Sequence, residues 1–70
     1  MRNKLREERF KLRMSQYVLT NLSGVSQSRI SLIENELSEP SEAEKKKIAK
    51  ALKVKISDLF PDTSANGNGY

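Results

Sequence analysis

The sequence predicts an all-α fold of five short helices, and three kinds of observation support this prediction. Serines stand where helices can begin, since Ser15, Ser26 and Ser41 each precede a run of helical character. Apolar residues recur in those runs at three- and four-residue intervals. Gly24 separates two of the runs, and a sharp turn there needs a positive φ that other residues adopt at a cost. We therefore expect one compact domain over residues 1–60 and a polar, disordered tail over residues 61–70.

The first two predicted helices span residues 2–12 and 16–23. The first carries a narrow apolar stripe of Leu5 and Leu12, with Met14 just beyond it. Ser15 is the expected N-cap of the second, because its hydroxyl oxygen can accept a hydrogen bond from a free backbone N–H of the first turn. On a helical wheel the predicted buried side chains of the second helix share one arc: Val18, Leu19 and Leu22.

The third helix is expected to begin after Ser26 and to bury Ile30 and Ile33. The fourth has the clearest start, since Ser41 and Glu44 form a capping box and Pro40 discourages helix before it. Its apolar stripe contains Ile48, Ala51 and Leu52, and its lysines 45, 46, 47 and 50 are expected to be solvated. A short fifth helix from about residue 57 returns Leu59 and Phe60 to the core, with Val54 and Ile56 leading into it.

The composition excludes several classes of protein. Seventy residues make one domain, near the lower limit for a core without disulfides or metal. The chain has no cysteine and no histidine, so we expect no disulfide, no metal site and no cofactor. It also has no glycine-rich phosphate loop and no carboxylate pair in an evident apolar pocket, which argues against an enzyme. No apolar run reaches the length of a membrane span and no signal peptide is evident, so we expect a cytoplasmic protein that does not enter a membrane.

The third helix carries an unusual polar face. An arc of about 140° opposite the isoleucines holds short hydrogen-bonding side chains, one leucine and no acid, with Arg29 on its flank. Glutamine can pair with adenine, leucine can contact a thymine methyl group, and arginine can reach guanine or phosphate. This face therefore suits the major groove of DNA, although an ordinary solvated surface remains the alternative. The arc residues are Gln27, Ser28, Ser31, Leu32 and Asn35.

The net charge of +4 is unevenly distributed. Residues 1–13 and 45–55 are basic, whereas residues 34–44 contain five glutamates and no basic residue. A basic balance favours a polyanionic partner, but solvated helix faces would have the same composition. The acidic segment would be repelled by DNA, so it either stands away from the duplex or faces a basic partner subunit.

Several motifs in the right order resemble the Cro and phage-repressor-like (Xre) helix-turn-helix family. The matching pieces are Ser15-Gln16, Gly24-Val25-Ser26, Ile30-Ser31-x-Ile33-Glu34-Asn35, Pro40-Ser41, residues 48–52 and Asp58-Leu59-Phe60. The match covers about residues 4–60 and implies a compact, lambda-repressor-like DNA-binding domain. It implies that Gln27, Ser28 and Leu32 read bases, as the wheel independently indicates, and that Gln16 contacts phosphate and braces the reading helix. It also implies an ion pair between Arg9 and Glu34.

We add Arg29 and Ser31 to the base-reading candidates. Arg13 adjoins the Ser15 cap and could reach a phosphate at the N-terminus of the second helix. The candidate set for phosphate contacts and bracing is Arg13, Ser15, Gln16, Ser26 and Asn35. The candidates for a two-fold interface are apolar residues that so small a domain cannot easily hide, namely Leu37, Ile56 and Phe60.

The sequence departs from the family pattern at four positions. Arg13, Glu36 and Lys53 replace a common glycine or asparagine, so those connections either change shape or carry strain. Thr20 stands where the family usually has alanine packed against the reading helix, which predicts a slightly wider contact there.

The resemblance implies a DNA-binding transcriptional regulator, most simply a repressor that binds a palindromic operator in double-stranded DNA as a homodimer. The alternative is a protein-interaction module on the same scaffold, such as an antitoxin-like or bridging factor. The acidic segment and the spare apolar residues support that alternative.

Overall fold

The computed structural model describes residues 3–61 and contains five helices and no strand within them. The helices are α1 (Leu5–Lys11), α2 (Gln16–Ser23), α3 (Gln27–Glu34), α4 (Glu42–Leu52) and α5 (Ile56–Leu59). The all-α, five-helix prediction is confirmed. The predicted tail lies outside the described residues from position 62 onward. None of the helices described is long and apolar enough to span a membrane.

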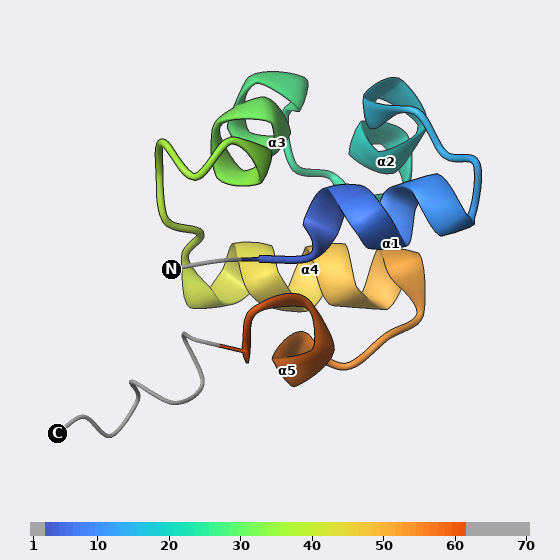
Figure 1. Cartoon of the computed structure of the whole chain (residues 1–70). Coiled ribbons are helices and arrows are strands. Elements are labelled where there is room, and N and C mark those ends of the chain that lie inside the picture. The colour runs from blue at the N-terminus through green and yellow to red at the C-terminus, as the bar shows by residue number, and fades with distance from the viewer. Residues whose placement is uncertain (1–2, 62–70) are drawn as a thin grey trace, which may run out of the picture.

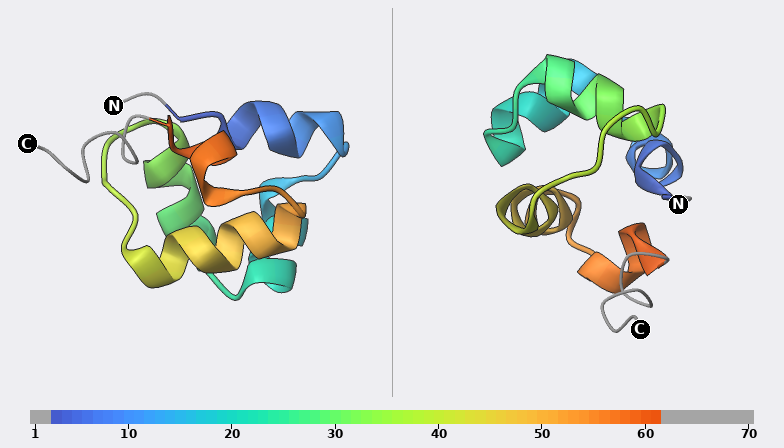
Figure 2. Two further views of the ribbon diagram at one scale, coloured as in Figure 1. Left: turned by 90° about the horizontal axis from the view of Figure 1, so that it is seen from below. Right: turned by 90° about the vertical axis from the view of Figure 1, so that its left-hand side faces the viewer.

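Helices α2 and α3 lie together on one side of the molecule. In the right-hand view of Figure 2, α1 and α4 are both seen nearly end-on, with α2 and α3 on one side of them and α5 on the other. Helix α2 packs against α3 and α4, α5 packs against α4, and α1 contacts α3. The α2–α3 pair therefore forms an outer face of the molecule (Figure 1).

The core draws on all five helices and the turn after α2. Its fully buried side chains include Phe60, which meets the leucines and isoleucines of the other elements. Sequence analysis missed Val25 and Ala49, which are also buried. The core residues are Leu5, Leu19, Val25, Ile30, Ile33, Ile48, Ala49, Leu52, Leu59 and Phe60.

Three predicted core residues are exposed instead. Leu12 is 53% exposed and Leu22 59% exposed, while Val18 also faces solvent. Only Leu19 of the predicted arc on α2 is buried, because α3 and α4 cover a narrower part of that helix than the wheel suggested. Lys45 differs in the opposite direction: its side chain is buried rather than solvated, and its Nζ pairs with Glu42 at 3.0 Å.

The predicted serine caps are present. Ser15 Oγ accepts from the N–H of Val18, and Ser26 Oγ accepts from the N–H of Arg29. Ser41 Oγ accepts from the N–H of Glu44, whose carboxylate accepts from the N–H of Ser41 in return, which completes the capping box. These local bonds explain why the starts of α2, α3 and α4 were predictable from sequence.

Candidate nucleic-acid interface

The polar side chains predicted to read DNA lie together on the outer face of α2 and α3. A shallow hollow of about 510 Å³ is lined by one residue at the start of α2 and four on α3. No acidic side chain lines it. The lining residues are Gln16, Gln27, Ser28, Ser31 and Leu32, and we call this surface the polar hollow.

The turn between α2 and α3 sets how these residues are presented. Gly24 ends α2 with φ 79°, and its N–H donates to the carbonyl of Thr20 at 2.8 Å. Val25 is buried next to it, and the N–H of Val25 donates to Ser23 Oγ. A Cβ at position 24 would meet nothing within 4 Å, so the positive φ, rather than lack of space, favours glycine there. With Val25 anchored, Gln27 and Ser28 face outward in the first turn of α3.

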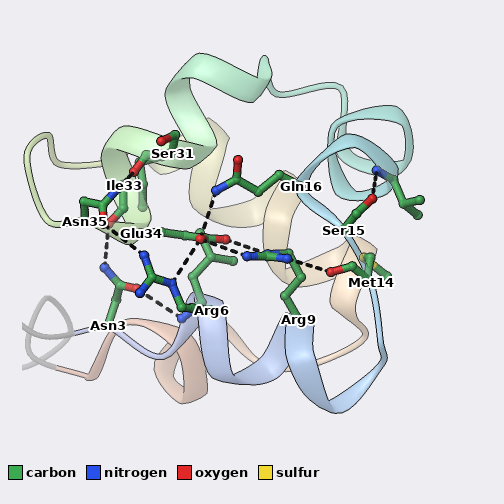
Figure 3. A network of polar contacts seen from close by, with 12 residues as sticks. Asn3, Arg6, Arg9, Met14, Ser15, Gln16, Ser31, Ile33, Glu34 and Asn35 are labelled. Carbon is green, nitrogen blue, oxygen red and sulfur yellow. Dashed lines mark hydrogen bonds and ion pairs between the residues drawn. The ribbon is translucent and has the colours of Figure 1, made fainter.

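A buried carboxylate ties α3 to α1 and α2 (Figure 3). Glu34 accepts two bonds from the Arg9 guanidinium, 2.7 Å from Nε to Oε2 and 3.0 Å from Nη2 to Oε1. Gln16 Nε2 donates to Glu34 Oε1 at 3.1 Å. The ion pair that the resemblance implied is therefore present, and Gln16 braces α3 through the same carboxylate.

The environment of Glu34 keeps it ionised. Burial acts to raise the pKa of this carboxyl, but the hydrogen bonds from Arg9 and Gln16, the charge of Arg9 and the bond from Arg6 outweigh burial and hold the pKa below its ordinary value. Its negative charge is thus compensated inside the domain rather than presented to a ligand.

Arg29 is a correction to the predicted reading set. Its guanidinium turns toward the segment before α4, where Nε and Nη2 donate to the Glu44 carboxylate at 2.9 Å. Nη1 donates to Ser38 Oγ and Nη2 also to the carbonyl of Glu39. Because these bonds occupy the guanidinium, Arg29 braces the loop between α3 and α4 and does not line the polar hollow.

The other contact candidates lie around the edge of the polar hollow. Ser15 and Ser26 are exposed, with their hydroxyl oxygens used as caps. Asn35 lies outside the hollow, since its amide donates to the carbonyl of Ser31 and its Oδ1 accepts from Arg6. Arg13 is exposed just before Ser15 and forms no ion pair within residues 3–61.

Most acidic groups of residues 34–44 have partners within the domain, and whether this segment stands away from DNA or faces a partner subunit stays a prediction. Glu34, Glu42 and Glu44 pair with the chain's own Arg9, Lys45 and Arg29. Glu36 accepts from the backbone N–H of Asn3. Most of the segment's acidic groups are therefore engaged within the domain, which lowers their repulsion of a polyanion without a partner subunit.

Of the three interface candidates, Leu37 is 74% exposed and Ile56 is half-buried against the core. Phe60 is a correction: it is fully buried within its own domain and has no surface to offer a second copy. Phe60 is buried because α5 packs against α4 and places this side chain in the core.

Two residues that were not predicted as site residues, Asn3 and Arg6, hold the N-terminal part of the domain against α3. Asn3 Nδ2 donates to the carbonyl of Ile33 at 2.8 Å, and its Oδ1 accepts from the N–H of Leu5. Arg6 donates to Asn35 and Glu34. The preference of asparagine for helix starts was a usable signal for Asn3. Arg6 gave none, because surface arginines are common.

Comparison with known proteins supports this interpretation of the geometry. A family model described as helix-turn-helix matches residues 4–59, which is most of the chain. A search of curated proteins found no match. The resemblance inferred from the sequence motifs is thereby confirmed. The chain belongs to the Cro/C1-type, Xre-like helix-turn-helix family, a family of DNA-binding regulators.

Proposed function

We propose that this protein is a sequence-specific transcriptional repressor that binds a palindromic operator in double-stranded DNA as a homodimer, in the cytoplasm of a prokaryotic cell. The observation that carries the proposal is the polar hollow, where Gln27, Ser28, Ser31 and Leu32 lie together beside Gln16 without an acidic neighbour. In helix-turn-helix proteins the second helix of the motif enters the major groove. Helix α3 occupies that position here.

The four α3 side chains of the polar hollow each suit a group on a base edge. Gln27 at the start of α3 suits a bidentate contact with adenine, and Leu32 suits the methyl group of thymine. Ser28 and Ser31 can donate or accept, so they adapt to several bases. Arg29 is not part of the proposed reading set because its donors are used inside the domain.

Phosphate contacts are proposed at the start of α2. The first backbone N–H groups of a helix lack intrahelical partners and favour an anion. Gln16 stands at this end and Arg13 is exposed before it. Such contacts would set the register of α3 in the groove without reading sequence.

The dimer is proposed on grounds of specificity. One reading helix contacts only a few base pairs, whereas two copies about 34 Å apart address successive turns of the major groove. Leu37, with most of its side chain exposed, and Ile56 are the remaining candidates for the interface.

Substitution Gln27→Ala tests the reading role. We expect it to relax base preference at one operator position and to cost roughly 1–3 kcal/mol of discrimination there, because a bidentate base contact is lost. A binding-site selection from random duplexes, run for the parent and the variant, measures the preference.

The matched control is Asn21→Ala, which removes another exposed amide of the helix pair from a position outside the polar hollow. This variant is expected to select the same operator as the parent. A Gln27→Ala protein that keeps the parental preference at every position would remove Gln27 from the reading set.

A further inference from the structure

A second hollow lies near the C-terminal ends of α1, α2 and α4. It has a volume of about 780 Å³ and shares no residue with the polar hollow. Its apolar lining consists of Leu12, Met14, Leu22 and Ala51. Its basic lining consists of Lys47, Lys50 and Lys53, and we call the whole surface the lysine-rimmed groove.

The apolar part of this groove is not covered by the domain itself. Leu12 and Leu22 have more than half of their side chains exposed, although leucines of this kind would stabilise a 70-residue domain if they were buried. They come from the ends of two different helices and lie on one surface with Met14 and Ala51. A contiguous exposed apolar surface with a polar rim is typical of an interaction site.

The charge of the groove specifies the kind of partner. Lys47 and Lys50 lie about one turn apart on α4, and Lys53 follows at its C-cap. All three line the groove, so they form its basic edge. Within residues 3–61 none of the three forms an ion pair, whereas Lys45 on the same helix does. No acidic side chain lines the groove. Its electrostatic complement is a segment with acidic residues beside apolar ones.

We propose that the lysine-rimmed groove is a docking site for a short amphipathic helix of another protein, with apolar anchors on Leu12 and Leu22 and glutamates or aspartates against the lysines. A helix satisfies its own backbone hydrogen bonds, whereas an extended segment would need a free strand edge. Residues 3–61 contain no strand that could offer one.

Two other occupants fit the groove less well. A second copy related by two-fold symmetry would bring like lysine edges together, which opposes such a pairing. DNA phosphates would pair with the lysines but would make no favourable contact with the exposed Leu12 and Leu22. Of these three occupants, the acidic amphipathic helix is the one that complements both the apolar lining and the lysines of the groove.

The first test uses the full chain and a display library of short helical peptides with leucine-rich faces, flanked at random by glutamate or lysine. We expect glutamate-flanked peptides to be enriched. Their affinity should fall as salt rises from about 0.1 M to about 1 M, since screening shortens from about 10 Å to about 3 Å. Failure to enrich any peptide, or enrichment of lysine-flanked ones, would overturn the proposal.

The second test locates the site with one enriched peptide. Leu22→Glu should weaken binding at least about tenfold, since burial of one leucine side chain is lost. Lys50→Glu should weaken binding about three- to tenfold, because it reverses an exposed attraction. The matched control Lys46→Glu makes the same charge reversal on α4 outside the groove, where the side chain is exposed, and should leave affinity unchanged.

Circular dichroism establishes that each variant is folded, and all three substituted residues are exposed in the parent. If Lys46→Glu and Lys50→Glu weaken peptide binding equally, the peptide is attracted by the overall positive charge of the protein and not by the groove, which would overturn the proposed site.

If the protein instead self-associates in sedimentation experiments, loss of this self-association in Leu22→Glu would identify a second copy as the occupant of the groove. Loss of duplex DNA binding in Lys50→Glu with unchanged peptide binding would assign the lysines to DNA. A Gln27→Ala protein with a relaxed operator preference and unchanged peptide binding would show that the two proposals can be tested separately.

Discussion

Thr20 carries a buried hydroxyl with no hydrogen-bond partner within residues 3–61. Its position on α2 is the one where the family pattern usually places alanine. A buried polar atom without a partner costs free energy, because it gave up its bonds to water on folding. Sequence analysis expected a wider helix contact here, and the structure adds an energetic reason why the residue is unfavourable.

Thr20→Val is expected to raise the free energy of unfolding by about 1 kcal/mol, because it removes the unpartnered hydroxyl and keeps the shape of the side chain. Urea unfolding followed by circular dichroism measures the change. Thr20→Ser is the control: it keeps the hydroxyl and loses a methyl group, so it should lower the free energy of unfolding by about 1 kcal/mol. A Thr20→Val protein less stable than the parent would show that the hydroxyl is satisfied in solution.

Single side chains were predictable where their partners are local. The Ser15, Ser26 and Ser41 caps bond to N–H groups three residues ahead, so their signal lies within one short stretch of sequence. Arg29 was misplaced because its partners, Ser38 and Glu44, follow 9 and 15 residues later. A helical wheel places such a residue on a flank but cannot say which way its guanidinium turns.

At the scale of helices and their connections, three residues other than glycine adopt the left-handed conformation within residues 3–61. Arg13, Glu36 and Lys53 have φ of 54°, 60° and 60°. These are the departures from the family pattern for which either a new shape or strain was expected. The connections keep the left-handed backbone and accept strain, since side chains with a Cβ adopt that region at a cost.

Lys53→Gly is expected to raise the free energy of unfolding by about 0.5–1 kcal/mol. Relief of the left-handed conformation is worth roughly 1–2 kcal/mol and exceeds the roughly 0.5–1 kcal/mol that glycine loses in backbone entropy. Chemical denaturation of the folded chain measures it. We choose Lys53 rather than Glu36 for this test because the Glu36 carboxylate also accepts a hydrogen bond from the backbone N–H of Asn3, which a glycine would remove.

The control for this change is Lys46→Gly. Lys46 is an exposed residue inside α4 and has no positive φ, so glycine there only adds conformational freedom to the unfolded chain and should lower the free energy of unfolding by about 0.5–1 kcal/mol. If both glycine variants lose stability, the backbone at Lys53 is not strained.

Helix boundaries were more predictable than helix faces. The bounds of α2 agree with the prediction, because Ser15 and Gly24 mark both of its ends. Val18 and Leu22 were assigned to the core wrongly, since spacing along one helix does not reveal which side its neighbours cover. The same limitation hid the lysine-rimmed groove, to which Leu22 contributes.

At the scale of the whole molecule, stability should depend on acidic pH. The hydrogen bond from Arg29, the bond from the Ser41 backbone and the charge of Arg29 lower the pKa of Glu44 to about 2, against the opposing effect of burial. The pKa of Glu34 is also lowered. Because these carboxyls have lower pKa values folded than unfolded, their stabilising contribution is complete above the unfolded value near 4.5.

We expect stability to fall as the pH drops from about 4.5 toward about 2, as protons bind preferentially to the unfolded chain. Urea midpoints across this range measure the fall. Arg29→Met should show a shallower fall, since the pKa of Glu44 returns toward its ordinary value without the guanidinium. Lys46→Met loses the same charge at a residue without an ion pair within residues 3–61 and should follow the parent. Identical pH profiles for Arg29→Met and the parent would contradict the role of this pair.

The proposed dimer makes a geometric prediction about DNA. Inserting about 5 base pairs between the half-sites should abolish tight binding, because it turns the second half-site to the opposite face of the duplex. Inserting about 10 base pairs should not restore it, because the half-sites would then lie about 68 Å apart, whereas the reading helices of the proposed dimer are about 34 Å apart. Gel-shift titrations with the operator from the binding-site selection measure this, and an affinity that neither insertion changes would indicate that the copies bind independently.

The family and the all-α fold were predictable from sequence because many short motifs occur in the right order from Ser15 to Phe60. The packing of the core was less predictable. Phe60 was predicted to lie at a dimer interface, because the sequence does not show how completely α5 folds back against the rest of the domain. Long-range packing of this kind depends on all the helices at once.

The contacts of Glu34 have a consequence for the rate and the thermodynamics of ligand binding. Its carboxylate joins α3 to α1 and α2 through Arg9, Arg6 and Gln16, so the orientation of α3 is settled before any ligand arrives. A preorganised surface loses little conformational entropy on docking. The association rate would then be limited by diffusion and electrostatic steering rather than by a folding step. The heat capacity change of binding would reflect the apolar area buried in the complex rather than ordering of the protein.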